Sequence, residues 1–237
     1  QDKKSTFYHI DFSFDELRLG GSAFAQSQGY VGSDVPTVKN PDYFRDAFNA
    51  VQTLINKGLI LAGHDISAGG LITTLLEMTF ANTEGGMDVC LDKFKTDDLV
   101  RVLFAENPGV VVQIADADKK EFKKILDEVG VGYVKLGTPA EERQIMVTLG
   151  EATYQFGIDY LRDIWYETSY LLDTKQSHNG CAKQRYENYK QQPLEYYIHP
   201  EFTGKFKQFG LDPNRREPSG IKAASIREKG TNGEREY

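Results

Sequence analysis

Residues 59–80 limit the possible folds more than any other stretch, because a short apolar segment there passes through a polar turn into a longer apolar segment. The sequence reads LILAGHDISAGGLITTLLEMTF. The first part has the length of a strand, and the second is long enough for three turns of helix. Gly69 and Gly70 stand at the junction, where glycine permits backbone angles that other residues avoid. The pattern predicts a strand, a tight connection and a helix.

Two interpretations of this connection remain open from the residues alone. The N-terminal end of a helix presents unpaired N–H groups and the positive end of the helix dipole, which favour phosphate, and a nearby carboxylate can hold a divalent cation. Asp65, Ser67 and the amides of Gly69 and Gly70 would then form a Mg–nucleotide site. Alternatively, the glycines serve only the turn and close packing. Neither GxxxxGK[ST] nor GxGxxG occurs in this segment.

Strands and helices alternate along the first two thirds of the chain. The pattern predicts strands at 6–14, 59–65, 87–91, 109–114, 133–136, 144–149 and 152–156, and helices at 22–26, 41–57, 70–80, 97–105, 119–129 and 160–172. This order predicts an α/β (α+β) layered sandwich, in which a mixed sheet has flanking helices.

Several side chains receive specific predictions. Tyr8 and Ile10 alternate with His9 along the first strand, which places His9 on a polar face. Ser22 follows Leu-Gly-Gly and is expected to cap a short helix, although a second phosphate-facing turn is the alternative. Trp165, the only tryptophan, is expected to be a core anchor rather than a ligand-stacking platform. In the helix at 41–57, Phe44, Phe48, Val51, Leu54 and Ile55 form the predicted apolar stripe.

Composition excludes several classes of function. The net charge of −7 over 237 residues argues against nucleic acid as the main partner. Cys90 and Cys181 lack metal-ligand spacing, and we expect free thiols in a reducing compartment. No apolar run reaches membrane-spanning length, and residues 1–4 do not resemble a signal peptide. These features predict a cytoplasmic protein without a membrane partner, and the absence of a starting Met fits an excised segment.

Residues 173–218 are polar and poor in aliphatic side chains. They predict a connector that wraps over neighbouring domains, with aromatic anchors at Tyr186, Tyr189, Tyr196, Tyr197 and Phe202. Aromatic residues interleaved with Lys and Arg also occur in nucleic-acid-binding segments, but the acidic chain disfavours that reading.

Three motifs, in order, resemble the phosphoribosylformylglycinamidine synthases of purine biosynthesis. GHDISAGGLITTLLEMTFAN resembles the family's H-D-x-S-D-G-G-L-x-x-x-L-x-E-M-x-F-A segment. LGGSAFAQ resembles its L-G-G-S-x-L-A segment, and IREKGTNGERE resembles its L-R-E-x-G-x-N-G-x-x-E segment. The family's synthetase part belongs to the superfamily of aminoimidazole ribonucleotide synthetase, whose C-terminal domain is an α/β sandwich.

The resemblance implies that the chain is part of a larger ligase. Residues 1–160 would be the C-terminal lobe of the second synthetase half, 161–217 a helix and extended linker, and 218–237 the first strand and turn of a truncated glutaminase. The whole enzyme converts formylglycinamide ribonucleotide, glutamine and ATP to formylglycinamidine ribonucleotide, glutamate, ADP and phosphate. The glutaminase nucleophile and base would lie beyond Tyr237, so neither cysteine is assigned to them and this chain alone is expected to be inactive.

The same resemblance implies roles for two residues. Asp65 matches a magnesium ligand at the family's second, structural nucleotide site, and Ser67 matches a residue that contacts the nucleotide. Ala68 departs from the family's Asp, which implies weaker support for the site rather than its loss. His64 is expected to be a hydrogen-bonded structural residue rather than a general base, and Glu77 a residue of the helix face.

Two alternative functions remain. The chain could be a non-catalytic nucleotide-binding scaffold module, which a natural start and stop at its ends would favour. It could also belong to another ATP-using member of the superfamily, of the selenophosphate or thiamine-phosphate type, although the resemblance at 226–236 speaks against this.

Overall fold

The computed structural model describes residues 4–96, 98–189 and 197–218, with Gly220, Lys222 and Ala224. The chain divides into two compact units between Gln192 and Pro193. Within the described part of the chain, no helix combines the length and apolarity needed to span a bilayer.

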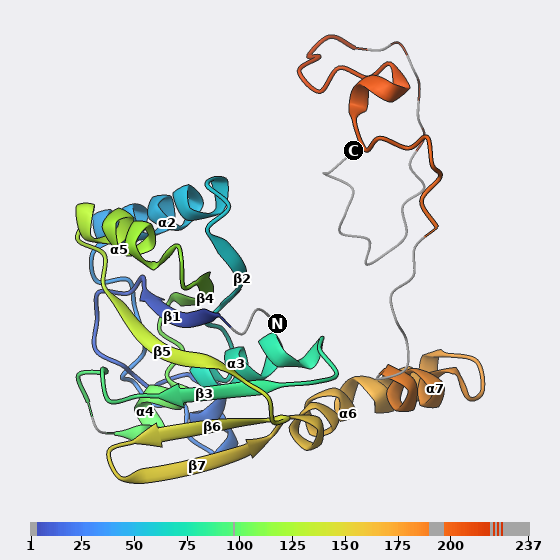
Figure 1. The fold of residues 1–237 in the computed structure, drawn as a ribbon. Helices are drawn as coiled ribbons and strands as arrows, with labels where there is room; N and C mark the ends of the chain where they lie inside the picture. The colour runs from blue at the N-terminus through green and yellow to red at the C-terminus, as the bar shows by residue number, and fades with distance from the viewer. Residues whose placement is uncertain are drawn as a thin grey trace. The chain divides into compact units, whose positions relative to one another are not determined.

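A mixed seven-stranded sheet forms the centre of the first unit (Figure 1). Its strands are β1 (Ser5–Asp11), β2 (Ile60–Asp65), β3 (Gly86–Cys90), β4 (Gly109–Ala115), β5 (Tyr133–Ala140), β6 (Gln144–Leu149) and β7 (Ala152–Gly157). They lie in the order β2-β4-β1-β5-β3-β6-β7. Neighbours are antiparallel except for the parallel pair β3 and β6.

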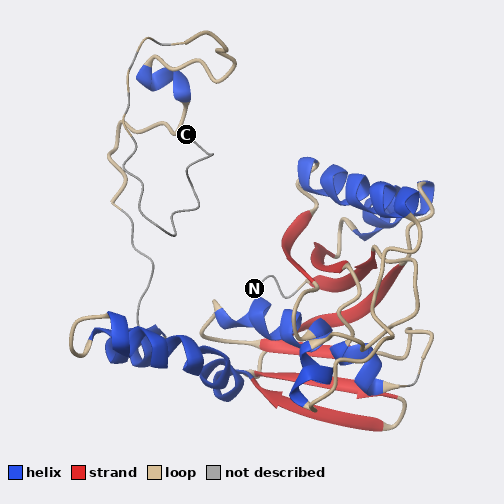
Figure 2. Ribbon diagram, turned by 180° about the vertical axis from the view of Figure 1, so that it is seen from behind, coloured by secondary structure: helices blue, strands red, loops and turns tan. Residues whose placement is uncertain are grey.

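Helices cover both faces of the sheet (Figures 1 and 2). The helices of this unit are α1 (Ala23–Ser27), α2 (Pro41–Asn56), α3 (Gly70–Phe80), α4 (Leu99–Phe104), α5 (Lys119–Glu128), α6 (Ile158–Gln176) and α7 (Cys181–Asn188), of which α6 and α7 lead away from the sheet (Figure 1). The helices α2 and α5 pack with Tyr8 and Ile10 of β1, whereas α3 and α4 pack with Phe7. Because neighbouring strand residues point to opposite faces, these two apolar clusters lie on opposite sides of the sheet. The predicted fold class is confirmed.

The prediction of a polar face for His9 is wrong, because both faces of β1 are covered. His9 is 9% exposed, on the same side of the strand as Phe7, and its ring centroid lies 5.6 Å from that of Phe94. Burial lowers the pKa of His9 to about 4, against the opposing effect of the Asp11 carboxylate. The sequence showed alternation of apolar and polar residues, but not the second layer of helices.

Most predicted elements are present with shifted ends. β1 ends at Asp11 rather than residue 14, and α4 begins at Leu99 after its N-cap Asp98, while Asp97 lies outside the described residues. The helix α2 begins as predicted after Asn40, whose side chain accepts the amides of residues 42 and 43. Its predicted apolar stripe is partly wrong, because Phe48 and Ile55 are about half exposed, while the buried residues are Ala47, Ala50, Val51 and Leu54.

The start of the predicted connector is helical instead of extended. α6 continues to Gln176, and α7 folds back on it (Figure 1). The Arg162 guanidinium carbon lies 3.4 Å from the ring centroid of Tyr189 and 5.6 Å from that of Tyr186, so these two tyrosines hold the α6–α7 pair together. In the second unit, Tyr197 is 88% exposed. Tyr196 lies outside the described residues, and so do most of residues 218–237, where the first strand and turn of a glutaminase are expected.

The second unit contains a short 3₁₀ helix, η2 (Phe206–Phe209). The ring centroid of Phe202 lies 6.0 Å from that of Phe209. Phe202 is about half exposed and Phe209 is more than half exposed. This packing is local to the unit.

Candidate functional site

The predicted strand, turn and helix form the connection between β2 and α3. β2 lies at the edge of the sheet, next to β4. Just after the end of β2, the Ile66 amide donates a hydrogen bond to the carbonyl of Gly109 in β4 at 2.8 Å. Gly69 and Gly70 have φ of +89° and +71°, and α3 begins at Gly70. Such backbone angles strain any residue with a side chain, so the local fold requires both glycines.

Close packing is a second reason for the glycine pair. A Cβ on Gly70 would lie 2.7 Å from the Leu103 carbonyl oxygen and 2.7 Å from the carbonyl carbon of Phe104, both backbone atoms of α4. A Cβ on Gly69 would lie 2.2 Å from Thr73 Oγ1. The first turn of α3 therefore sits directly against the end of α4.

The amides of both glycines are engaged within the chain, which disfavours the interpretation in which they face a phosphate and favours the one in which they serve the turn. Gly70 N–H donates to the Ser67 carbonyl at 3.0 Å. Gly69 N–H donates to Glu106 Oε1 at 2.8 Å, and the same oxygen accepts the Ala23 amide at 2.7 Å. Glu106 thus joins the turn before α3 to the start of α1. Sequence reasoning missed this residue, because nothing in its spacing from either motif marks it.

Residues 19–22 form the turn that Glu106 joins to α3. Ser22 is fully buried, and its hydroxyl accepts the Ala25 amide at 3.1 Å and donates to the Leu19 carbonyl at 2.6 Å. The predicted N-cap is confirmed. A Cβ on Gly20 would lie 2.6 Å from the Asp34 backbone, which explains the first glycine of this motif.

Asp65 and Ser67, the predicted ligands, are both exposed on the β2–α3 connection. The Asp65 side chain is 72% exposed, with Oδ1 3.5 Å from His64 Nδ1. The backbone carbonyl of Asp65 accepts a hydrogen bond from the hydroxyl of Thr74, a buried residue, at 3.0 Å. A carboxylate oxygen suits Mg²⁺, which commonly takes one or two protein carboxylates along with phosphate oxygens and water. Among the described residues, no three His, Cys, Asp or Glu side chains cluster to hold a metal ion.

His64 and Glu77 link this connection to α6. His64 Nδ1 lies 2.8 Å from the Asp65 carbonyl oxygen, which confirms the predicted hydrogen-bonded histidine, and its Nε2 lies 3.2 Å from Glu77 Oε2. Glu77, on α3 as predicted, also accepts the indole N–H of Trp165 at 2.9 Å. Trp165 is 50% exposed, so the prediction of a core anchor is wrong.

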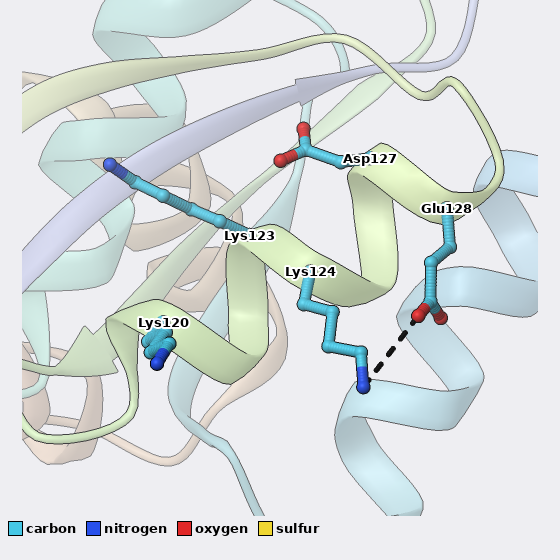
Figure 3. Close-up of a pocket in the computed structure, with 5 residues that line it drawn as sticks. All are labelled: Lys120, Lys123, Lys124, Asp127 and Glu128. Atoms are coloured by element: carbon cyan, nitrogen blue, oxygen red, sulfur yellow. Dashed lines mark ion pairs between the residues drawn. The ribbon is translucent and has the colours of Figure 1, made fainter.

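Two open surface hollows lie elsewhere in the first unit. One, of about 550 Å³, is lined by charged residues of α5, among which Lys124 and Glu128 form an ion pair at 3.7 Å (Figure 3). The other, of about 760 Å³, lies between the segment after β3 and the β6–β7 turn. Neither is lined by Asp65 or Ser67. The α5 hollow carries both signs of charge on a single helix, so it presents no converging set of ligand groups.

Comparison with known proteins defines the class. The family described as AIR synthase related protein, C-terminal domain, matches residues 13–149, which is more than half of the chain. The chain belongs to this family. Its sheet and covering helices also match solved structures of Thermotoga maritima PurL, such as the complex with ATP, with a TM-score of 0.53 and 16% identity over 68% of this chain and 26% of that one.

Within this class, the chain is similar to phosphoribosylformylglycinamidine synthases over nearly its whole length. It is 32% identical over 231 residues to the probable chloroplastic/mitochondrial enzyme of Arabidopsis thaliana, covering 96% of this chain and 16% of the relative. It is also 32% identical over 235 residues to the human enzyme, covering 96% of this chain and 17% of the relative. The chain therefore spans about a sixth of the length of these relatives.

Proposed function

We propose that this chain is a segment of a glutamine-dependent phosphoribosylformylglycinamidine synthase. Residues 1–160 would form the C-terminal lobe of its second synthetase half, 161–217 the linker, and 218–237 the start of the glutaminase. Similarity to the curated relatives over 96% of the chain supports this, because it continues well beyond residue 149, where the family match ends.

The full enzyme would use ATP and ammonia from glutamine to amidate formylglycinamide ribonucleotide in the cytoplasm. The partners of this chain would be the remaining domains of that enzyme. A Thermotoga maritima PurL structure contains FGAR, which supports the choice of substrate. Cys90 and Cys181 are free thiols, and neither lies in the strand-to-helix elbow that a glutaminase nucleophile needs. We therefore assign no catalytic residue to this chain.

Within that enzyme, Asp65 would bind Mg²⁺ and Ser67 would contact ATP or ADP. The observation that carries this proposal is the exposure of both side chains at the start of α3, in a fold shared with PurL structures that contain ATP and ADP. When bound, the metal would offset the negative charge of the phosphates. Because Glu106 holds the Gly69 amide, we expect the side chains of Asp65 and Ser67, rather than the glycine amides, to make the contacts.

The site would be shared with a lobe outside this chain. Asp65 supplies one carboxylate from an open surface, and Ala68 beside it offers neither charge nor hydrogen bond. We therefore expect this chain alone to bind Mg–ADP too weakly to saturate, and the full-length enzyme to retain ADP.

Calorimetric titration of Mg–ADP into the chain, and measurement of ADP retained by the purified full-length enzyme, test the proposal. Asp65→Asn should lower the ADP affinity of the full-length enzyme by about tenfold or more. Asp118→Asn is the matched control, because Asp118 also precedes a helix that follows a strand, and it should leave affinity unchanged. Saturable binding to the chain alone would refute the shared site, and full ADP affinity in Asp65→Asn would refute the assignment of Asp65.

A further inference from the structure

A hydrogen-bonded bridge connects α6 to the strand that carries Asp65. The Trp165 indole N–H donates to one carboxylate oxygen of Glu77 at 2.9 Å, while the other oxygen lies 3.2 Å from His64 Nε2. Since Trp165 lies on α6, Glu77 on α3 and His64 on β2, one carboxylate joins three elements. The Glu77 side chain is 21% exposed, whereas the His64 side chain is 31% and Trp165 50% exposed, so the bridge lies at the surface of the unit.

The bridge ends on Asp65 itself. His64 Nδ1 lies 2.8 Å from the backbone oxygen of Asp65 and 3.5 Å from its carboxylate. Each nitrogen of the imidazole ring therefore faces an oxygen, which fixes the orientation of the ring. A displacement of Glu77 would move the ring, and with it the backbone that directs the Asp65 side chain.

Packing holds the other end of the bridge. The Trp165 ring lies 5.2 Å from that of Phe80, at the end of α3, and 6.3 Å from that of Tyr166. The two helices also pack directly against each other. Half of the Trp165 surface nevertheless remains exposed, so core burial alone does not account for its position.

We propose that Trp165 and Glu77 are positioning residues that orient Asp65 through His64. This inference rests on the proposed function, because it makes the geometry of the Mg–nucleotide site depend on the position of α6 relative to α3. α6 starts at Ile158, directly after β7, and leads out of the sheet (Figure 1). Movement of the segment beyond the sheet would therefore reach the nucleotide site along this bridge.

Backbone amide NMR spectra of the ligand-free chain test the bridge without any need for nucleotide binding. Trp165→Phe removes the N–H donor but keeps an aromatic ring against Phe80, and it should shift the amide signals of residues 65–67. Tyr160→Phe is the control on the same helix, because Tyr160 is 71% exposed, and it should leave those signals in place. Unmoved signals at 65–67 in Trp165→Phe would overturn the proposal.

A double variant tests whether the effect passes through Glu77. Glu77→Ala should shift the same signals, and addition of Trp165→Phe should then cause no further shift at residues 65–67. An additional, independent shift would refute the route through Glu77.

ADP retention by the full-length enzyme gives the functional readout. Trp165→Phe should lower ADP affinity about threefold to tenfold, less than Asp65→Asn, since it acts at a distance. Unchanged affinity in Trp165→Phe, with loss in Asp65→Asn, would overturn the bridge and keep the proposed function. Unchanged affinity in Asp65→Asn would instead refute the proposed function, and the ligand-free spectra would still decide the bridge.

Discussion

Two strand-to-helix connections in this chain solve the same geometric problem differently. In the β4–α5 connection the Asp118 amide donates to the Ala115 carbonyl, and Lys119 pairs with Asp116 at 2.8 Å. Asp116 also reaches the start of the chain, because its amide donates to the Lys4 carbonyl and its carboxylate accepts the Thr6 hydroxyl. The β2–α3 connection needs two glycines with positive φ, and a carboxylate from residue 106 holds its amide. Both connections are held by distant parts of the chain, but only the second has glycines with positive φ and a helix packed against its turn. The two connections therefore differ in backbone conformation and close packing rather than in their reliance on distant contacts.

Among the variants that test this comparison, replacement of Gly70 should lower the free energy of unfolding most. Gly70→Ala combines a positive φ with a backbone clash against α4, and we expect it to lower the free energy of unfolding by about 2–5 kcal/mol. Gly58→Ala is the matched control, since Gly58 has φ of +68° but open space around it, and about 1 kcal/mol is expected. Urea denaturation measures both, and equal losses would show that packing against α4 is unimportant.

Acid should loosen the β2–α3 connection before the β4–α5 connection. The pKa of His9 is about 4 in the folded chain, lowered by burial from 6.5, so the unfolded chain binds the additional proton as pH falls from 6.5 to 4. Stability is therefore lost across that window, by about 3 kcal/mol in total. A Cβ on Gly109 would lie 2.9 Å from His9 Nε2, and the Gly109 carbonyl anchors Ile66, so protonation acts next to residues 65–70.

Urea denaturation and amide exchange between pH 7 and pH 4 check this prediction. His9→Gln should reduce the pH dependence of the free energy of unfolding between pH 7 and pH 4. Exchange in wild type should increase at residues 65–70 before residues 116–119. The same pH dependence in His9→Gln as in wild type would contradict the assignment.

Loss of the Glu106 carboxylate should have an intermediate effect. Glu106→Ala leaves the amides of Ala23 and Gly69 without their acceptor, and we expect a loss of about 2 kcal/mol. Glu106→Gln keeps an acceptor oxygen of the same reach, so it should lose less than about 1 kcal/mol. Thermal or urea unfolding measures the difference, and equal small losses in both variants would show that the connection does not need this distant acceptor.

Loss of the Thr74 hydroxyl should have the smallest effect on the β2–α3 connection. Thr74→Val removes the hydrogen bond to the Asp65 carbonyl, with an expected loss of about 1 kcal/mol. Asp118→Ala is the comparison in the β4–α5 connection, because Asp118 makes no side-chain cap bond, and it should change stability by less than about 0.5 kcal/mol. Amide exchange near residue 65 should accelerate in Thr74→Val, and equal effects of the two variants would remove the contrast.

The sequence predicted well those features that depend on neighbours along the chain. The alternation of strands and helices, the Asn40 and Ser22 caps, and the glycine turn before α3 all follow from residue type and spacing. Its errors share one cause, which is the absence of information about the other side of an element. His9 lies under a second layer of helices, and Trp165 lies half exposed at the surface.

By itself, the sequence determined which residues turn, cap and alternate, because backbone strain and hydrogen bonding between near neighbours are local properties. It also singled out Asp65 and Ser67, whose roles remain a proposal. Only the tertiary structure decided that Glu106 holds the Gly69 amide, that α4 leaves no room for a side chain at Gly70, and that Glu77 joins Trp165 to His64. These contacts connect residues 13 to 88 positions apart, and only chain folding brings such residues together.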